Sequence, residues 1–452
     1  MKPDFVILAA GKGQRMLDNQ PKVLQNIAGI PMAQHLLNTV VEIKNSRQII
    51  VIGEEAEKVK SSLVVPRNTH WIKQRKQLGT AHAVKAALPK TRAGSIVVVL
   101  YGDVPLVQSK TINNLLRLAS TNNLAILTFQ AKKPRGYGRI IRNSRGQVES
   151  IVEEKDASTQ QKQIKEVNSG ILAIRSRYLK KLLPKVNNKN ASKEFYLTDI
   201  ISLARAEGIK IKPLLLENST EALGANTLEE LHDLERACQR ARAIRMVNSG
   251  VRIADVNRID IRGNLESGKG TFIDVNNVFE GDVVLGRGVS IGPNCYIRDS
   301  KIEDGVVVKA NTVIEDSKIG ASCSLGPFTR VRGRTNLESF SELGNFVEAN
   351  RTSIGRFSKA KHLTYLGDAT LGEGVNVGAG TITCNYDGTK KHKTKMADGV
   401  FIGSNTSLVA PITLGERAYT GAGSVITKNV PKDSLAIGRA RQSKPIKKKK
   451  NR

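Results

Sequence analysis

A six-residue repeat runs from about residue 253 to residue 437 and constrains the fold more than any other feature of the sequence. An aliphatic residue opens most units, and glycine often follows it, as at Ile291, Ile319 and Leu414. A period of six does not match the periodicity of an α-helix. It does match a coil with three short flat faces, in which one aliphatic residue points inward at each corner. The repeat is typical of a hexapeptide parallel β-helix of roughly ten coils, in which a small residue or glycine lets the chain bend. Apolar residues are then buried between neighbouring coils, and this burial stabilises the stack.

The first half of the chain alternates short apolar runs with stretches of helical pattern. This alternation predicts a mostly parallel sheet with helices on both faces, an α/β fold that binds ligands at the carboxyl ends of its strands. Asp103 follows one such run, where a carboxylate could bind a metal ion, although an isolated aspartate there is as often a helix N-cap. The expected strands cover residues 5–10, 48–53, 95–100 and 124–129, and a helix begins near residue 79.

A glycine-rich loop, GKGQRM at 11–16, follows the first expected strand. Glycines let backbone N–H groups approach a phosphate chain closely, because no Cβ stands in the way. Lys12, Arg15 and Lys22 add positive charge to the same segment. The spacing matches neither the Walker loop nor the dinucleotide-binding fingerprint, so the loop by itself does not identify a nucleotide site.

Apolar residues at helical spacing between 227 and 250 predict one long helix between the two halves. Thr227 and Glu230 have the spacing of a capping box, and Gly250 is a suitable stop. The expected domains are therefore 1–226, a linker helix at 227–250, a β-helix domain at 251–440 and a basic, disordered tail at 441–452.

The formal net charge is +30, from 71 lysines and arginines against 41 acidic residues. These cations are spread along the chain and are dense only in the tail, which favours small anionic substrates over specific nucleic-acid binding. The sequence contains no run of 18 apolar residues, so we expect no membrane-spanning helix. The N-terminus lacks a signal-peptide pattern. Four scattered cysteines predict free thiols and a cytoplasmic location.

Several motifs in the first half resemble those of sugar-phosphate nucleotidyltransferases. With the hexapeptide repeat behind them, nearly the whole chain resembles bifunctional enzymes that make UDP-N-acetylglucosamine for envelope polymers. The resemblance implies that the C-terminal half acetylates glucosamine-1-phosphate with acetyl-CoA. The N-terminal half would then transfer uridylyl from UTP and release pyrophosphate. The motifs are LAAGKGQRM at 8–16, PKVL at 21–24, QLGTA at 77–81, YGDVPL at 101–106, GYGRI at 136–140, IVE at 151–153, EVNSGI at 166–171 and FYLTDI at 195–200.

Uridylyl transfer depends on charge neutralisation and in-line positioning more than on an acid or a base. The resemblance implies a Mg²⁺ ion held by Asp103 and Asn226, whose oxygens are ligands that Mg²⁺ prefers. One departure is Gln14, where the family usually has threonine. The resemblance also implies that UTP and the sugar product contact Leu8, Ala9, Ala10, Gly11, Arg15, Lys22, Gln74, Gly79, Thr80, Tyr101, Gly102, Asp103, Gly138, Glu153, Asn168 and Asn226.

Acetyl transfer requires a free amine, so a base must take a proton from it. His362 lies in KHLTYLGD at 361–368, where the repeat prefers an apolar or small residue. An isolated histidine there would be read as a hydrogen-bonded surface residue, but the resemblance implies the catalytic base. Nearby, the basic stretch at 383–394 interrupts the period, and such loops usually build a solenoid's binding face.

For glucosamine-1-phosphate the resemblance implies contacts with Arg332, Asn350, Arg351, Tyr365, Asn376 and Lys391. For acetyl-CoA it implies Ala379, Asn385, Tyr386, Ser404, Ala422 and Arg439. The family usually has lysine at the position of Asn350, and we expect Arg351 to take over the phosphate contact. The alternation of side chains along a strand argues against this, because neighbouring residues point to opposite sides.

The resemblance further implies a left-handed coil and a homotrimer with acetyl-transfer sites at the chain interfaces. Two alternatives remain open. The chain could transfer only the nucleotidyl group, with the β-helix as an oligomerising or regulatory platform, but His362, Asn385 and Tyr386 argue against this. It could also be a non-catalytic assembly subunit, against which Asp103, Lys22 and His362 argue.

Overall fold

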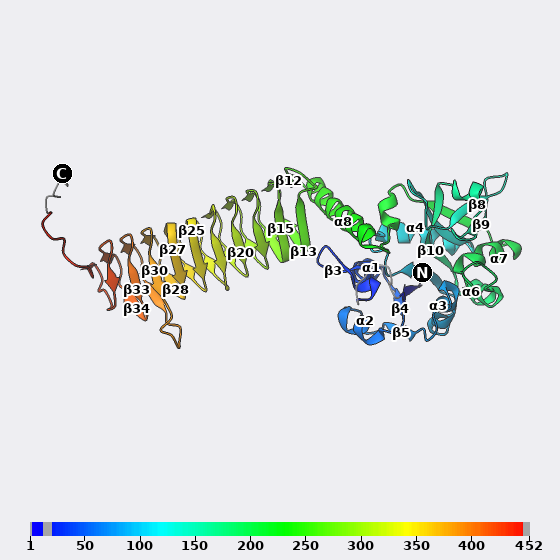
Figure 1. Ribbon diagram of the computed structural model, residues 1–452, viewed down its shortest axis with the longest axis horizontal. Coiled ribbons are helices and arrows are strands. Elements are labelled where there is room, and N and C mark those ends of the chain that lie inside the picture. Colours follow the sequence, from blue (N-terminus) through cyan, green and yellow to red (C-terminus); the bar gives the residue numbers. More distant parts are fainter. Residues whose placement is uncertain (1, 12–19, 446–452) are drawn as a thin grey trace, which may run out of the picture. The chain divides into compact units, whose positions relative to one another are not determined.

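The structure is a computed structural model that describes residues 2–11 and 20–445. The predicted contact residue Arg15 and the end of the basic tail lie outside these ranges. The chain divides into two compact units, Met1–Cys238 and Gln239–Arg452, and the division falls inside helix α8 (Leu228–Asn248). Figure 1 shows an α/β unit and a stack of short strands. No helix in the described part of the chain is both long and apolar enough to cross a membrane.

A nine-stranded sheet forms the centre of the first unit, with the main strand order β11-β7-β10-β6-β1-β4-β5. Along this main order the pairs are parallel except where β10 runs antiparallel between β6 and β7, so the predicted mostly parallel sheet is confirmed. The hairpin of β8 (Arg139–Arg142) and β9 (Val148–Val152) joins through β10. The main strands are β1 (Pro3–Ala9), β4 (Arg47–Ile52), β5 (His70–Lys73), β6 (Ile96–Tyr101), β7 (Leu124–Gln130), β10 (Glu166–Arg175) and β11 (Ile211–Leu215).

Both faces of this sheet are covered by helices. Alternate residues of β1 serve opposite faces: Phe5 and Ile7 belong to one buried cluster, and Val6 and Leu8 to the other. The first cluster includes residues from α1 (Met32–Val41), α2 (Ala56–Ser62) and α4 (Ser109–Ser120). The second includes residues from α3 (Thr80–Ala87), α6 (Ser176–Leu182) and α7 (Ile200–Ala206). A central sheet buried in this way leaves its strand ends as the place for a ligand.

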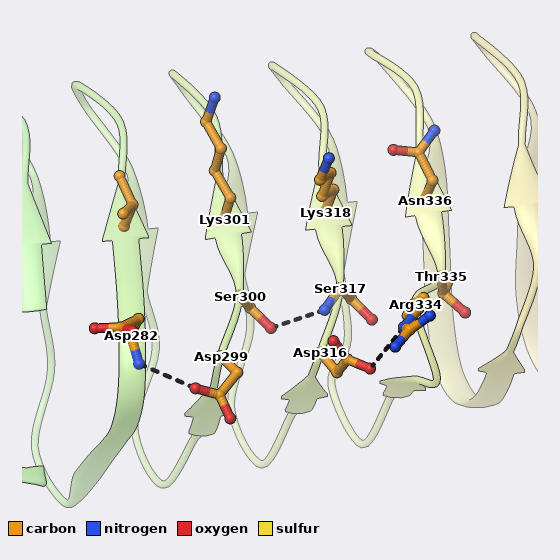
Figure 2. Close-up of a pocket in the computed structure, with 11 residues that line it drawn as sticks. Asp282, Asp299, Ser300, Lys301, Asp316, Ser317, Lys318, Arg334, Thr335 and Asn336 are labelled. Atoms are coloured by element: carbon orange, nitrogen blue, oxygen red, sulfur yellow. Dashed lines mark hydrogen bonds and ion pairs between the residues drawn. The ribbon is translucent and has the colours of Figure 1, made fainter. Parts of the chain in front are cut away.

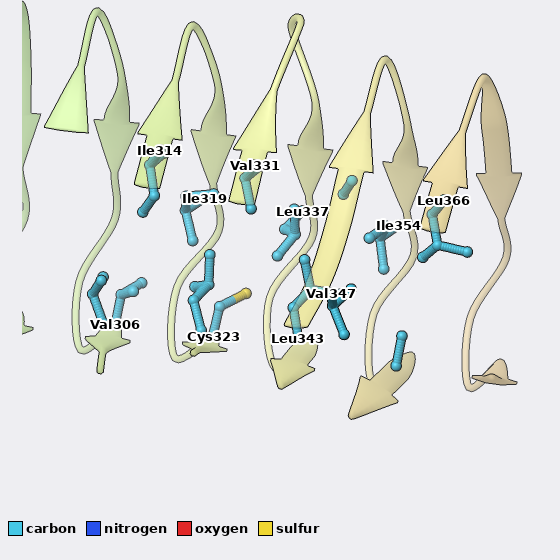
Figure 3. Close-up of a cluster of buried hydrophobic side chains, with 14 of the residues drawn as sticks. Val306, Ile314, Ile319, Cys323, Val331, Leu337, Leu343, Val347, Ile354 and Leu366 are labelled. Carbon is cyan, nitrogen blue, oxygen red and sulfur yellow. The ribbon is translucent and has the colours of Figure 1, made fainter. Parts of the chain in front are cut away.

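The second unit is one 26-stranded parallel sheet wound into a β-helix, from β12 (Arg252–Ile253) to β37 (Leu435–Ala436). Along most of the β-helix, equivalent residues on successive coils lie 17 or 18 positions apart, as in the pairs Ile302–Ile319 and Ile319–Leu337. Three units of about six residues therefore make each coil, as the repeat predicts. Figure 3 shows Ile319, Leu337 and Ile354 stacked inside the β-helix, where each is at most 1% exposed.

The corners of the coil differ from the expectation of small residues. Several non-glycine residues at corners have left-handed backbone geometry, among them Phe328 (φ 57°), Phe346 (φ 58°) and Leu363 (φ 45°). The rings of Phe328 and Phe346 stack on successive coils with centroids 5.3 Å apart. Stacking between coils, together with backbone pairing, holds bulky residues in a geometry that L-residues otherwise avoid.

The second half of α8 covers the first coil of the β-helix. The Gln239 side chain, 2% exposed, exchanges two hydrogen bonds with the backbone of Ile261, at 3.0 and 2.7 Å. Arg242 donates to the carbonyls of Ile261 and Gly263, and Ala243 joins the β-helix core. The helix therefore protects the end of a stack whose backbone groups would otherwise be open to another strand.

Candidate active sites

A cavity of about 310 Å³ opens at the carboxyl ends of β1 and β6. Among the residues predicted for UTP, it is lined by Leu8, Ala10, Gly11, Lys22, Gln74, Gly79, Thr80, Tyr101 and Asp103. It is also lined by Val23, Gln77, Ala83 and Glu194, which the sequence analysis missed. Gln77 lies within the QLGTA motif and donates to the carbonyl of Ala10, so the motif itself could have indicated it.

The two predicted metal ligands meet at one cationic group. The Lys22 ammonium donates to Asn226 Oδ1 at 2.6 Å and forms an ion pair with the Asp103 carboxylate. Asp103 follows β6, whereas Asn226 comes just before α8. A Cβ on Gly224 would lie 3.0 Å from the Asp103 carbonyl oxygen, so glycine allows this close approach. One carboxylate and one amide oxygen thus surround a single positive charge, and this donor set fits Mg²⁺.

The start of α8 holds Asn226 in place. The Thr227 hydroxyl accepts from the backbone N–H of Glu230 at 3.2 Å, as the predicted capping box requires. The Glu230 carboxylate accepts from the backbone N–H of Asn226 at 2.6 Å, one residue earlier than in a standard box. At the other end the helix stops at Asn248, and Gly250 has the left-handed φ of 100° expected of a stop.

At the far wall of the cavity, Gln74 is almost completely buried, at 5% exposed. Its side-chain Nε2 lies 2.9 Å from His82 Nδ1 and 3.4 Å from the Gly79 carbonyl oxygen. Gly79 has φ 112°, and a Cβ there would lie 2.6 Å from the Phe195 carbonyl oxygen. Only glycine fits this turn, which starts α3 and places Thr80 on the cavity wall.

Tyr101 and Glu153 lie close to each other at the predicted sugar end. Burial, and after it the charges of Glu153 and Asp103, raises the pKa of the Tyr101 hydroxyl. Burial also raises the pKa of Glu153, although the Thr198 hydroxyl donates to its carboxylate at 3.0 Å. Gly170 (φ 84°) packs so tightly on the Tyr101 ring that a Cβ would lie 2.6 Å from it.

The other predicted sugar contacts join this group through the backbone. A Cβ on Gly138 would lie 3.4 Å from the Glu153 carboxylate, and the Asn168 N–H donates to the Gly138 carbonyl at 2.8 Å. Gly102 donates its N–H to the Leu8 carbonyl at 2.9 Å, while Ala9 is the last residue of β1. The structure thus brings the predicted residues of the first unit together, apart from Arg15, which lies outside the described residues.

In the β-helix, His362 is exposed on β27 (Lys359–Gly367), beside Asn345 of the coil before it. The Thr364 hydroxyl donates to the His362 carbonyl at 2.7 Å. Within residues 20–445, no side chain or backbone group forms a hydrogen bond with the His362 ring. Its ring nitrogens therefore face solvent or a ligand.

Arg351 lies at a left-handed corner (φ 55°) and grips Asp368 with two hydrogen bonds of 2.7 and 2.9 Å. Its guanidinium also donates to Asn350 Oδ1 at 3.1 Å, and Asn385 donates to Asp368 at 2.5 Å. The Arg351 guanidinium holds the pKa of Asp368 below its usual range. Because the chain turns a corner at Arg351, strand alternation does not carry its side chain away from Asn350.

Two of the other predicted contacts for glucosamine-1-phosphate, Arg332 and Tyr365, lie near this group. Arg332 pairs with Asn350 on the neighbouring coil and binds Glu348 at 2.8 Å. A Cβ on Gly367 would lie 2.5 Å from the Tyr365 hydroxyl, so glycine leaves room for that side chain. Asn376 is on the next coil, where it pairs with Lys359 of β27.

The loop after β30 (Ile382–Cys384) carries Lys391, which forms an isolated bridge with Tyr386. Asp387 closes this loop: one carboxylate oxygen lies 2.7 Å from His392 Nε2, and the other accepts from the backbone N–H groups of Thr389 and Lys390. These contacts lower the pKa of Asp387, the Lys390 N–H first among them. The Lys391 charge also contributes to lowering the pKa of Asp368, so the loop and the coil with Arg351 both influence this carboxylate.

The small residues predicted for acetyl-CoA form a column along the edge of the β-helix. The Ala379 carbonyl accepts from Asn405, the neighbour of Ser404, at 2.7 Å, and the Ser404 carbonyl accepts from Gly423, the neighbour of Ala422, at 2.7 Å. A Cβ on Gly423 would lie 3.8 Å from the Arg439 side chain. Ala379, Ser404 and Ala422 thus occupy matching places on successive coils, and the column ends near a cation.

A separate groove of about 550 Å³ runs across earlier coils and includes none of the residues predicted for acetyl transfer. Figure 2 shows Lys301, Lys318 and Asn336 along one side and Asp299 and Asp316 along the other. Arg332 lies two residues before Arg334 on the last coil of this groove, whereas the other predicted acetyl-transfer residues lie on later coils.

The chain thus combines an α/β unit, in which Asp103 and Asn226 meet at Lys22, with a β-helix that carries the exposed His362, as in a two-part transferase. A family model described as a MobA-like NTP transferase domain matches residues 5–244, and one described as a GMPPB C-terminal domain matches residues 261–386. The protein named "Bifunctional protein GlmU" of Marinobacter nauticus is 48% identical over 437 residues, which cover 97% of this chain and 96% of the relative. That of Idiomarina loihiensis is 47% identical over 98% of this chain and 97% of the relative.

This chain belongs to the GlmU family of bifunctional enzymes. It is a nucleotidyltransferase in its N-terminal half and an acetyltransferase in its C-terminal half.

Proposed function

We propose that the chain makes UDP-N-acetylglucosamine at two separate sites. The β-helix acetylates glucosamine-1-phosphate with acetyl-CoA, and the 310 Å³ cavity of the first unit then transfers uridylyl from UTP. The observation that carries this proposal is the convergence of Asp103 and Asn226 on Lys22 beside that cavity. On this basis the uridylyl-transfer domain would be 1–226, the linker helix 227–250, the acetyl-transfer domain 251–440 and the tail 441–452.

In uridylyl transfer, a phosphate oxygen of the sugar attacks the α-phosphorus of UTP, and the bond to pyrophosphate breaks. Asp103 and Asn226 would hold Mg²⁺, which neutralises phosphate charge when bound. Lys22 adds its own positive charge to the same cavity. Tyr101 and Glu153 would orient the sugar, so that its phosphate lies in line with the leaving group.

In acetyl transfer, the substrate amine attacks the thioester carbonyl carbon, and the carbon–sulfur bond to coenzyme A breaks. The ring of His362 would take the amine proton, since imidazole is suited to this near neutral pH. Arg332, Arg351 and Lys391 would hold the phosphate of glucosamine-1-phosphate through charge-assisted hydrogen bonds. Acetyl-CoA would lie along the column of small residues, with Asn385 and Tyr386 beside the acetyl group.

A homotrimer would complete the acetyl-transfer site. The exposed corner residues Phe328 (49% exposed), Phe346 (57%) and Leu363 (63%) form an apolar column on the coils that lead to His362. Contiguous exposed apolar residues of this kind mark interaction surfaces. A second copy of the chain packed there would cover them and would also face the His362 ring.

We also propose a cytoplasmic location, because both substrates, UTP and acetyl-CoA, are cytoplasmic metabolites. Cys295, Cys323 and Cys384 are free thiols, as the sequence analysis predicted. Free thiols suit a reducing compartment.

A coupled assay tests the proposed function. The purified chain is supplied with glucosamine-1-phosphate, acetyl-CoA, UTP and Mg²⁺, and each component is left out in turn. We expect UDP-N-acetylglucosamine only when all four are present, and N-acetylglucosamine-1-phosphate when UTP alone is missing. Uridylyl transfer to supplied N-acetylglucosamine-1-phosphate without any acetyl transfer would instead support a β-helix that serves only as a platform.

A further inference from the structure

The amide of Gln74 has one defined orientation in the cavity wall. Its nitrogen lies 3.4 Å from the Gly79 carbonyl oxygen, which can only accept a hydrogen bond, and this contact identifies the NH₂ end of the amide. The second hydrogen of that NH₂ group is directed to His82 Nδ1 at 2.9 Å. His82 Nδ1 must therefore be the unprotonated nitrogen of the ring, and the proton lies on Nε2.

This arrangement uses both donors of the Gln74 amide and leaves its acceptor. No residue in the described ranges donates to Gln74 Oε1, and Gln74 lines the cavity while only 5% exposed. A ligand in the cavity therefore meets a fixed hydrogen-bond acceptor at this wall. Uracil presents an N–H donor at its N3 position, whereas cytosine presents an unprotonated acceptor there.

We propose that His82 is a positioning residue that sets the preference of this site for a uracil base over a cytosine base. The proposal rests on the uridylyl-transfer function proposed above and adds the residue that selects the base. His82 does not touch the nucleotide in this account. It acts through Gln74, because an imidazole acceptor behind the amide keeps the carbonyl end toward the cavity.

The local structure supports a fixed imidazole. His82 is in the first turn of α3 (Thr80–Ala87). The backbone around it is anchored: the Ala81 N–H donates to the Phe195 carbonyl at 2.9 Å, and the Ala83 N–H donates to the Gly79 carbonyl at 3.2 Å. Without the acceptor at His82, the amide could turn over and offer its nitrogen to cytosine N3.

Two substitutions at His82 test this proposal. His82→Leu removes the acceptor, whereas His82→Asn offers a side-chain oxygen close to the place of Nδ1. We expect kcat/KM for UTP to fall about tenfold in His82→Leu, because one hydrogen bond is lost. The ratio of kcat/KM for UTP to that for CTP should fall by about the same factor or more. In His82→Asn the ratio should stay within about threefold of the original.

The acetyl-transfer activity of the same preparations is the internal control, because it resides in the other half of the chain. A double-mutant cycle with Gln74→Leu provides a second test: in that background, His82→Leu should not change the UTP-to-CTP ratio further. An unchanged ratio in His82→Leu, an equal loss in His82→Asn, or additive effects in the cycle would each overturn the role of His82. If the unsubstituted chain fails to use UTP at all, the proposed uridylyl transfer is itself wrong.

Discussion

Lys22 Nζ donates a 2.6 Å hydrogen bond to Asn226 Oδ1, although the two residues are far apart in the sequence: Lys22 comes after β1, and Asn226 comes just before α8. The same ammonium group pairs with Asp103. Three segments of the chain are thus tied together at the point where the proposed reaction needs charge neutralised. Any substitution that disturbs this point should affect uridylyl transfer and leave the β-helix untouched.

We predict that Asp103→Asn lowers uridylyl transfer by about a hundredfold or more, because the substituted amide carries no charge for a metal ion or for Lys22. Acetyl transfer should be unchanged. Each half-reaction is measured separately in one preparation, at several Mg²⁺ concentrations. A parallel loss of acetyl transfer in a folded protein would mean that the two sites are not independent.

Removal of residues 447–452 should leave both reactions unchanged. The last strand, β37, ends at Ala436, and the predicted contact Arg439 also precedes the deleted segment. The deleted residues follow the last recognisable repeat of the sequence, and physiological salt screens the charge that they carry. Both activities are compared before and after the truncation. A selective loss of acetyl transfer would show instead that the tail takes part in binding coenzyme A.

The period of six was enough to predict the interior of the β-helix. Ile319, Leu337 and Ile354 open hexapeptide units, and the structure stacks them because a coil of three units returns the chain to the same face. The bulky corners at Phe328 and Phe346 were not predictable from the repeat. They depend on stacking between coils, which stabilises a local geometry that phenylalanine does not prefer on its own.

Within the candidate sites, contacts between distant residues escaped the sequence analysis. Asp103 and Asn226 were paired only through resemblance, since no local pattern links them. Asp368 was missed as a partner of Arg351, yet it lies 17 residues later, which is one coil of the β-helix. A coil length of 17 applied to Arg351 would have placed this carboxylate beside it. His82 was missed because its role depends on the orientation of the Gln74 amide.

The raised pKa of Glu153 leads to a prediction about stability. Burial raises this pKa, so the folded protein binds the proton more tightly than the unfolded chain does. The stability contributed by protonated Glu153 is complete below the unfolded pKa of about 4.3 and is lost as the pH rises through the folded value. Ionised Glu153 therefore destabilises the fold at pH 7.

Glu153→Gln should consequently stabilise the protein at pH 7, by about 0.5–2 kcal/mol, while the gain disappears near pH 4. A neutral amide can still accept the hydrogen bond from Thr198. The KM for N-acetylglucosamine-1-phosphate in uridylyl transfer should rise about tenfold, since an acceptor for the sugar is weakened. Denaturant unfolding of both proteins at the two pH values checks the first part. Equal stability differences at pH 4 and pH 7 would contradict it.

The last prediction concerns Arg351 and the phosphate of glucosamine-1-phosphate. Asn350 carries no charge and is only 3% exposed, whereas the guanidinium of Arg351 lies against its side chain. Asp368 and Asn350 together take three of the five guanidinium donors, which leaves two for phosphate. Arg351→Ala should raise the KM for glucosamine-1-phosphate about tenfold or more and leave that for acetyl-CoA unchanged, because a charge-assisted contact is worth roughly 1.5–3 kcal/mol.

A matched control separates phosphate binding from a loss of structure. Arg417 has the same left-handed corner geometry (φ 53°) and grips Asp433 with two hydrogen bonds, of 2.7 and 3.1 Å, on a later coil. Arg417→Ala removes a matching ion pair and should change neither KM, whereas Asn350→Lys should lower the KM for glucosamine-1-phosphate by adding the usual lysine of the family. The KM values of the three variants, measured by steady-state kinetics, decide whether Arg351 binds the phosphate. If Arg351→Ala behaves like Arg417→Ala, the phosphate is held by Arg332 and Lys391 alone, and Arg351 serves only to fix Asp368 and, through it, Asn385.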